Sequence, residues 1–81
     1  MSLTTQETAR TSRELVANLV QSGVDAATVA ATLNFSAERL ARTVGVTHDS
    51  RPADVWLLRD FLDQVNRDRG HTPIPWSVLT D

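Results

Sequence analysis

Apolar residues recur at helical spacing along most of the chain, and this pattern predicts four helices. The first begins near Thr4, because Thr4 and Glu7 have the spacing of a capping box, in which each side chain bonds a free amide at the helix start. Gly23 ends it, since glycine adopts the left-handed conformation without steric cost. The expected apolar stripe of this helix consists of Ala9, Leu15, Val16, Leu19 and Val20.

Residues 25–44 have the layout of a helix-turn-helix, in which a tight turn joins two short helices. Asp25 is a good N-cap for the first of these helices, and Ser36 is a good N-cap for the second. Between them, Asn34 can adopt the left-handed conformation that a tight turn needs. We expect the turn residue Phe35 to enter the core.

Three inward positions bear on how these two helices pack. Ala30 is small enough to let the second helix approach closely, and Leu40 directs an apolar side chain at the core. The third inward position has Thr43 beside Val44 where an aliphatic residue is usual, so the sequence specifies the crossing angle less well. Gly45 is expected to end the helix.

A fourth helix is predicted over residues 52–69. Ser50 or Asp49 would cap it, and Pro52 would lie in its first turn, where the missing N–H has no cost. Gly70 closes the helix. Its broad apolar face consists of Val55, Trp56, Leu58, Phe61, Leu62 and Val65.

The C-terminal tail, residues 70–81, has a different pattern. Pro73 and Pro75 disfavour a helix. Its apolar positions alternate, as in an extended segment with one buried face: Ile74, Trp76 and Val78. Two interpretations remain open, because the tail could fold back and bury its tryptophan or bind an aromatic groove of a partner.

The composition fits one all-α domain over residues 1–81, with four helices and an extended Pro-rich tail. A chain of 81 residues has a thin core, so a homodimer would cover apolar surface that the monomer leaves open. Cysteines, signal-peptide features and an apolar run of the roughly 20 residues that span a bilayer are all absent. We expect a cytoplasmic protein, since small secreted domains usually need disulfides.

The net charge of −2 weakens a nucleic-acid hypothesis, because nucleic-acid binders usually carry a basic excess. The imbalance is C-terminal: residues 52–81 have three arginines and five acids, whereas residues 1–51 have five of each. All basic residues are arginines, whose planar fork suits phosphate and guanine. Arg10, Arg13 and Arg51 could add backbone contacts to DNA, although solvation is the commoner role of such side chains.

If the third helix reads DNA, its exposed N-terminal positions make the contacts. Arg42 could bind a guanine edge, and Glu38 could accept a hydrogen bond from cytosine. Ser36, Thr28 and Arg39 could contact phosphates. The candidate DNA-binding residues are Thr28, Ser36, Ala37, Glu38, Arg39, Ala41 and Arg42. The alternative is a solvated face on which Glu38 and Arg42 pair at the i, i+4 spacing.

The chain offers little to support catalysis. Serine, histidine and acidic residues form no recognisable catalytic pattern, and a glycine-rich phosphate loop is missing from the sequence. His48, beside Asp49, and His71 fall in polar segments where solvated histidines are expected. We therefore expect no enzyme, no cofactor and no metal site.

Four sequence blocks resemble a family of short bacterial proteins of unknown function, across nearly the full length. The blocks are ELVANL at residues 14–19, SGVDAATVAATLNFS at 22–36, DVWLLRDFL at 54–62 and GHTPIPWSVL at 70–79. The last two are the most distinctive. The resemblance implies a small cytoplasmic helical protein similar to helix-turn-helix regulators. It implies no activity, and no functional residue can be transferred from it.

Two functions are therefore predicted. The first is DNA binding in transcriptional control, with the third helix in the major groove and two subunits on paired half-sites. The second is a protein–protein interaction module with the same fold, which the acidic C-terminal third favours. Trp56, Phe61 and Trp76 are the candidate dimer-interface residues, since aromatic side chains are enriched at interface centres.

Overall fold

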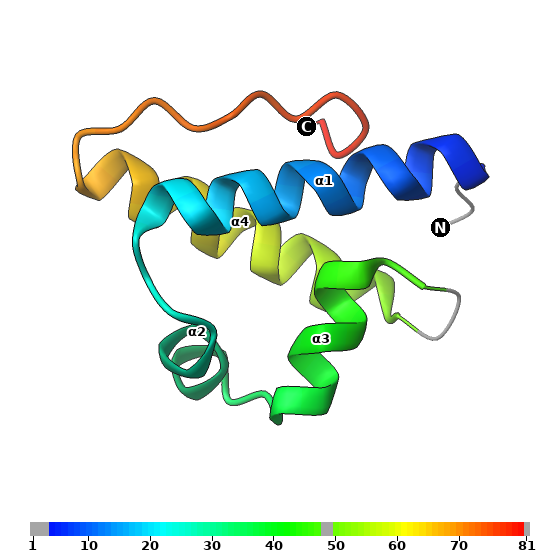
Figure 1. Ribbon diagram of the computed structural model, residues 1–81, viewed down its shortest axis with the longest axis horizontal. Helices are drawn as coiled ribbons and strands as arrows, with labels where there is room; N and C mark the ends of the chain where they lie inside the picture. The colour runs from blue at the N-terminus through cyan, green and yellow to red at the C-terminus, as the bar shows by residue number, and fades with distance from the viewer. Residues whose placement is uncertain (1–3, 48–49, 81) are drawn as a thin grey trace.

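The computed structural model describes residues 4–47 and 50–80, and every regular element in these ranges is a helix (Figure 1). The helices are α1 (Thr5–Ser22), α2 (Ala26–Leu33), α3 (Ala37–Gly45) and α4 (Pro52–Asp68). The two long helices, α1 and α4, pack against each other, and the short helices α2 and α3 lie together at one side of that pair (Figure 1). The prediction of an all-α fold is confirmed.

Local capping fixes the starts of the first three helices, as the sequence predicts. The capping box forms at α1: the N–H of Glu7 donates to Thr4 Oγ1 at 3.1 Å, and the N–H of Thr4 donates to Glu7 Oε1 at 3.0 Å. The side chains of Asp25 and Ser36 each accept the backbone N–H three residues on, at 2.7 and 3.1 Å. Asn34 ends α2 in the left-handed conformation, with φ 59°. These predictions succeed because each depends on neighbours in the sequence.

The end of α3 differs in detail from the prediction. Gly45 is the last helical residue, but Val46 is the residue that adopts the left-handed conformation, with φ 47°. Such a backbone costs about 1–3 kcal/mol for a β-branched residue. The side chain of Val46 is buried in the core, and this burial offsets the strain.

The start of α4 contradicts the predicted cap. The N-cap residue is Arg51, whose side chain makes no capping hydrogen bond, so Ser50 does not cap the helix. Asp49, the other predicted cap, lies outside the described residues. Pro52 is in the first turn as predicted, and it leaves one less backbone N–H in need of a partner. The helix ends one residue earlier than expected, before Gly70 in the left-handed region, at φ 78°.

The core draws on all four helices, the α2–α3 turn and the tail. Phe35 is buried there as predicted. The most deeply buried apolar residues are Leu15, Val29, Val55, Leu58, Leu62 and Leu79. Leu79 is the member that the alternation in the tail did not predict, and it brings the end of the described chain into the core.

The buried face of α1 is more polar than its apolar stripe suggests. The fully buried residues of this helix are Thr11, Leu15, Asn18 and Ser22. The hydroxyls of Thr11 and Ser22 donate to carbonyls of the preceding turn, which offsets the cost of burying them. Val16 and Val20 expose 43% and 74% of their surface, so this part of the predicted apolar stripe lies outside the core. The helix turns these valines away from α4.

The tail runs along α1 in the opposite chain direction and has no helix or strand between His71 and Thr80 (Figure 1). The side-chain amide of Asn18 holds both polar groups of Ile74: its Oδ1 accepts the N–H at 2.9 Å, and its Nδ2 donates to the carbonyl at 3.2 Å. Further along, Glu14 accepts both the N–H and the hydroxyl of Ser77. These bonds hold the tail on its own chain.

Candidate nucleic-acid interface

The exposed face of α3 carries most of the residues expected to contact DNA. Six of the seven candidates are exposed: Thr28, Ser36, Ala37, Glu38, Ala41 and Arg42. Within the described residues no ion pair joins Glu38 to Arg42, so the pairing that would have explained both charges is not formed. Both side chains therefore remain available to a partner.

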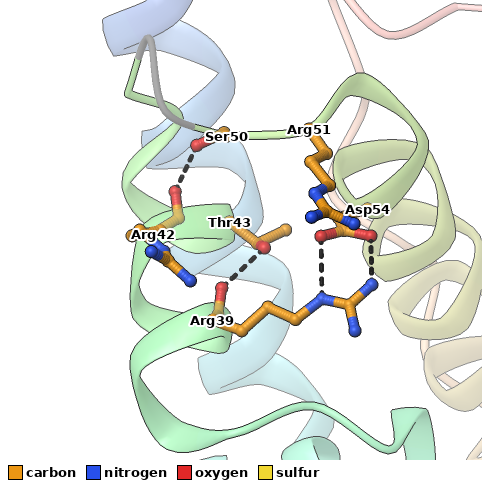
Figure 2. A pocket seen from close by; sticks show the side chains of 6 residues that line it. All are labelled: Arg39, Arg42, Thr43, Ser50, Arg51 and Asp54. Carbon is orange, nitrogen blue, oxygen red and sulfur yellow. Dashed lines mark hydrogen bonds and ion pairs between the residues drawn. The ribbon is translucent and has the colours of Figure 1, made fainter.

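Arg39, the seventh candidate, serves as a link between elements. Its Nε and Nη2 donate to the two carboxylate oxygens of Asp54 in α4, at 2.9 and 2.8 Å (Figure 2). Its guanidinium carbon also lies 4.2 Å from the centre of the Phe35 ring, which favours stacking of the cation on the ring. One side chain thus ties the α2–α3 turn and α3 to α4. Only the remaining guanidinium donors could reach a phosphate.

The electrostatics around Asp54 follow from this pair. Its side chain is 8% exposed, whereas that of Arg39 is 38% exposed. The two hydrogen bonds from Arg39 lower the pKa of Asp54 below its ordinary value, and the positive charges of Arg51 and Arg42 lower it further. The carboxylate is therefore charged at neutral pH, and it neutralises one of the three nearby arginines.

These arginines line a cavity of about 490 Å³ between α3 and the start of α4 (Figure 2). Its lining residues are Arg39, Arg42, Thr43, Ser50, Arg51 and Asp54. Three guanidiniums face one carboxylate, which leaves two positive charges in excess. The guanidiniums of Arg42 and Arg51 have no hydrogen-bond or ion-pair partner in the described ranges. The cavity is therefore suited to an anion.

Ser50 fixes the approach of the chain from α3 to α4. Its hydroxyl donates to the carbonyl of Arg42 and accepts the N–H of Thr47, the latter at 2.9 Å (Figure 2). The first bond satisfies a carbonyl in the last turn of α3, which has no partner within the helix. By holding the segment before α4 against α3, Ser50 helps to place Arg51 on the same cavity as Arg42.

Thr43 fills the inward position that the sequence left in question. It is 1% exposed, and its hydroxyl donates to the carbonyl of Arg39 at 2.7 Å. A threonine is thus accommodated because its one donor is satisfied within the helix.

Sequence reasoning missed the roles of Asp54 and Ser50. Asp54 has the ordinary appearance of an acid in the first turn of a helix, and its partner Arg39 is 15 residues away. Ser50 was predicted to cap α4, whereas it bonds backward to α3. The only signal in the sequence was the position of the polar residue Asp54 directly before the apolar run that starts at Val55. That position does not reveal which residue Asp54 bonds.

The candidate dimer-interface residues are half-buried against their own chain. The guanidinium carbon of Arg59 lies 5.6 Å from the centre of the Trp56 ring and 5.5 Å from that of Trp76. The indole N–H of Trp76 donates to Asp63 at 3.1 Å. Phe61 packs at the edge of the core. Contacts within the chain thus occupy much of this surface, and the dimer through these aromatics stays a prediction.

Histidines and acids do not gather at any one point. Among residues 4–47 and 50–80, no group of three or more histidines, aspartates or glutamates could hold a metal ion. His71 is exposed at the start of the tail, and His48 lies outside the described residues. The same ranges contain no helix with the length and apolar character needed to cross a membrane.

The family described as "Uncharacterized protein conserved in bacteria (DUF2316)" matches residues 1–81 of the chain. No curated protein and no solved structure matches the chain. Because the family match covers the whole length, the chain belongs to this bacterial family, as the four sequence blocks implied.

Proposed function

We propose that this member of the family binds DNA, with α2 and α3 acting as a helix-turn-helix and α3 entering the major groove. The chemistry of the turn supports the proposal: Asn34 is left-handed, Phe35 is buried and Ser36 caps α3. The pair of short helices carries an exposed face on its second member, as this role requires.

The observation that carries the proposal is the pair of unpartnered guanidiniums of Arg42 and Arg51. They come from different elements, and they lie beside the same cavity at the edge of α3. Arginine binds phosphate and guanine with parallel hydrogen bonds, so two such groups together suit the DNA backbone and a base edge. Arg42 and Arg51 make this site locally positive, although the net charge of the whole chain is −2.

Each residue of the site then has a distinct role. Arg42 contacts a guanine edge or an adjacent phosphate, and Arg51 contacts a phosphate. Arg39 positions α3 through Asp54 and offers its remaining donors to the backbone. Glu38 accepts from cytosine, which favours some sequences over others.

The same proposal covers the biological setting. Such a protein would act in transcriptional control in the bacterial cytoplasm, as a homodimer on two half-sites about one helical turn apart. It requires no catalysis, cofactor or metal. With only two free arginines per subunit at the site, we expect modest affinity that falls as salt rises.

The test is binding of the purified full-length protein to fragmented genomic DNA of the host across a salt series. We expect a few fragments to be enriched, with retention that weakens as salt rises. Affinity for an enriched fragment should fall about tenfold in Arg42→Ala and several-fold in Arg51→Ala, with a shallower salt slope for both. Arg69→Ala, an exposed arginine at the opposite end of α4, is the matched control and should bind like the wild type. Equal losses in all three variants would contradict a specific role for α3.

A second candidate function is protein–protein interaction. The observation that favours it is Glu38, an exposed and unpaired acid in the middle of the proposed reading face. If no DNA fragment is retained even at low salt, this candidate replaces DNA binding.

A further inference from the structure

The arginine cavity, the space of about 490 Å³ between α3 and the start of α4, presents only charged donors to a ligand. Both hydroxyls in its lining already spend their one donor: Thr43 donates to the carbonyl of Arg39 at 2.7 Å, and Ser50 donates to the carbonyl of Arg42. The free side-chain donors that remain belong to the guanidiniums of Arg39, Arg42 and Arg51 (Figure 2). The lining therefore selects for negative charge.

The charge of the cavity matches that of a dianion. Its one carboxylate, Asp54, is charged at neutral pH and already accepts two hydrogen bonds from Arg39. Three guanidiniums against one carboxylate leave two positive charges in excess, at Arg42 and Arg51. A phosphomonoester carries a charge of about −1.5 to −2 at neutral pH. Each phosphodiester of a DNA backbone carries a single negative charge, so the charge balance favours the monoester.

Part of this site is held in place before any ligand arrives. Both carboxylate oxygens of Asp54 fix the guanidinium of Arg39, whose central carbon lies 4.2 Å from the centre of the Phe35 ring. The N-cap residue of α4, Arg51, lines the cavity, and no side chain caps this helix, so the positive end of its dipole adds to the charge of the arginines. A preformed site loses less freedom on binding.

We propose that the arginine cavity binds the phosphate group of a small phosphomonoester. Arginine holds phosphate oxygens with parallel hydrogen bonds, and Arg42 and Arg51 line this cavity from two different elements. Small-molecule sites have volumes of about 300–1,000 Å³, so the cavity also has room for the organic part of such a ligand.

The ligand occupies the same two arginines that the proposed function assigns to DNA, so it displaces DNA and regulates binding. This regulatory effect rests on the proposed function, whereas the binding of phosphate does not.

The test is a nitrogen–proton correlation NMR titration of the full-length protein without DNA, in an amine buffer at about pH 8, where phosphate is a dianion. Inorganic phosphate is the probe, dimethyl phosphate represents the DNA backbone, and succinate represents a dianion whose charges lie apart. We expect inorganic phosphate to shift the amides of Arg42, Arg51 and Asp54 with a dissociation constant of about 1 mM or lower. Dimethyl phosphate should bind at least about tenfold more weakly, because it has one charge fewer. Succinate should also bind more weakly than phosphate.

Variants locate the site. Arg42→Ala and Arg51→Ala should each raise the dissociation constant for inorganic phosphate about tenfold or more, because each removes charged hydrogen bonds to the anion. Both side chains are exposed, so circular dichroism should report an unchanged fold. Arg69→Ala, which removes an exposed arginine at the opposite end of α4, is the matched control and should bind phosphate like the wild type.

Three results would overturn the phosphate site. They are shifts that do not saturate below about 100 mM phosphate, which indicate charge screening alone, binding of dimethyl phosphate or succinate as tight as that of phosphate, and unchanged phosphate binding in Arg42→Ala and Arg51→Ala. Tight binding of dimethyl phosphate would identify the cavity as a contact for the DNA backbone instead.

A second arm tests regulation. Inorganic phosphate should release a bound DNA fragment more effectively than chloride at equal ionic strength, and equal release would overturn the regulatory effect. The two proposals fail separately. If the protein binds phosphate but retains no DNA, DNA binding and its regulation are excluded and the phosphate site stands. If it retains DNA but binds no phosphate, the phosphate site is excluded and DNA binding stands.

Discussion

The two halves of this molecule differ in how much of their side-chain surface is buried and bonded within the chain. In the half formed by α1, α4 and the tail, side chains of α1 bond the backbone of the tail at Ile74, and Leu15, Leu58 and Leu62 are fully buried. The half formed by α2 and α3 buries few side chains and carries the arginine cavity beside α3. The long helices thus act as a scaffold, and the short helices leave their surfaces open for partners.

The largest expected effect is in the scaffold, at Asn18. The fully buried side-chain amide of Asn18 bonds both backbone polar groups of Ile74. In addition, Asn66 donates to the backbone carbonyl of Asn18 at 3.1 Å. Asn18→Ala leaves two backbone groups of the tail without partners, which we expect to lower the free energy of unfolding by about 3 kcal/mol in urea titrations. Gln21→Ala removes an exposed bond from the same helix to the tail and should cost no more than about 0.5 kcal/mol. Equal losses of unfolding free energy in Asn18→Ala and Gln21→Ala would show that the buried contacts to the tail contribute no more than the exposed one.

The tail provides the next largest effect. Leu79 is 1% exposed, so Leu79→Ala should lower the free energy of unfolding by about 2 kcal/mol or more through lost burial and a residual cavity. Its half-buried neighbour is the control, and Val78→Ala should cost less than half as much. Denaturation followed by tryptophan fluorescence measures both variants. A negligible effect of Leu79→Ala would show that the tail does not belong to the scaffold.

A smaller, pH-dependent effect is expected where the two halves meet, at Asp54. Its pKa is lower in the folded chain than in the unfolded chain, so the pair with Arg39 stabilises the protein above about pH 4 and ceases to do so as the pH falls through the folded-state pKa. Asp54→Asn should therefore lower the free energy of unfolding by about 1–2 kcal/mol at neutral pH.

The difference between wild type and Asp54→Asn should shrink toward zero in acid, and this trend is measured by urea unfolding at a series of pH values. The pKa values of Glu7, Asp25 and Asp63 are also lowered in the folded chain, but these residues are common to both proteins, so their effects cancel in the difference. Asp68→Asn, which changes an exposed carboxylate, should show no such trend. A difference that does not depend on pH would exclude the ion pair as its cause.

Prediction from the sequence succeeded where cause and effect lie within one helical turn. The capping box at Thr4, the caps at Asp25 and Ser36 and the left-handed Asn34 all depend on residues three or four positions apart. The order and approximate bounds of the helices followed from these signals and from the apolar periodicity.

Prediction from the sequence failed where the bonding or packing partners of a residue are distant in the chain. Asn18 is buried because Ile74, 56 residues later, needs its amide. Val16 and Val20 belong to the same apolar stripe as Leu15, yet the described part of the chain leaves 43% and 74% of their surface exposed. Periodicity identifies an apolar stripe, but the tertiary packing decides which edge of it enters the core.

The candidate site was partly predictable for the same reason. The exposure of Arg42 and Glu38 follows from their positions on α3, whereas the use of Arg39 as a link to Asp54 requires the packing of α3 on α4. Similarly, that Arg51 and Arg42 line one cavity depends on how the segment before α4 lies on α3, where Ser50 bonds the carbonyl of Arg42.

The central claim is that the open half, at α3, contacts DNA while the scaffold does not. Nitrogen–proton correlation NMR of the full-length protein, titrated with an enriched DNA fragment at low salt, tests it residue by residue. We predict shifts concentrated at Glu38, Ala41, Arg42 and Arg51, with Asn18 and Ile74 unchanged. Shifts confined to the tail and the aromatic surface, or no shifts at any DNA concentration, would contradict the claim.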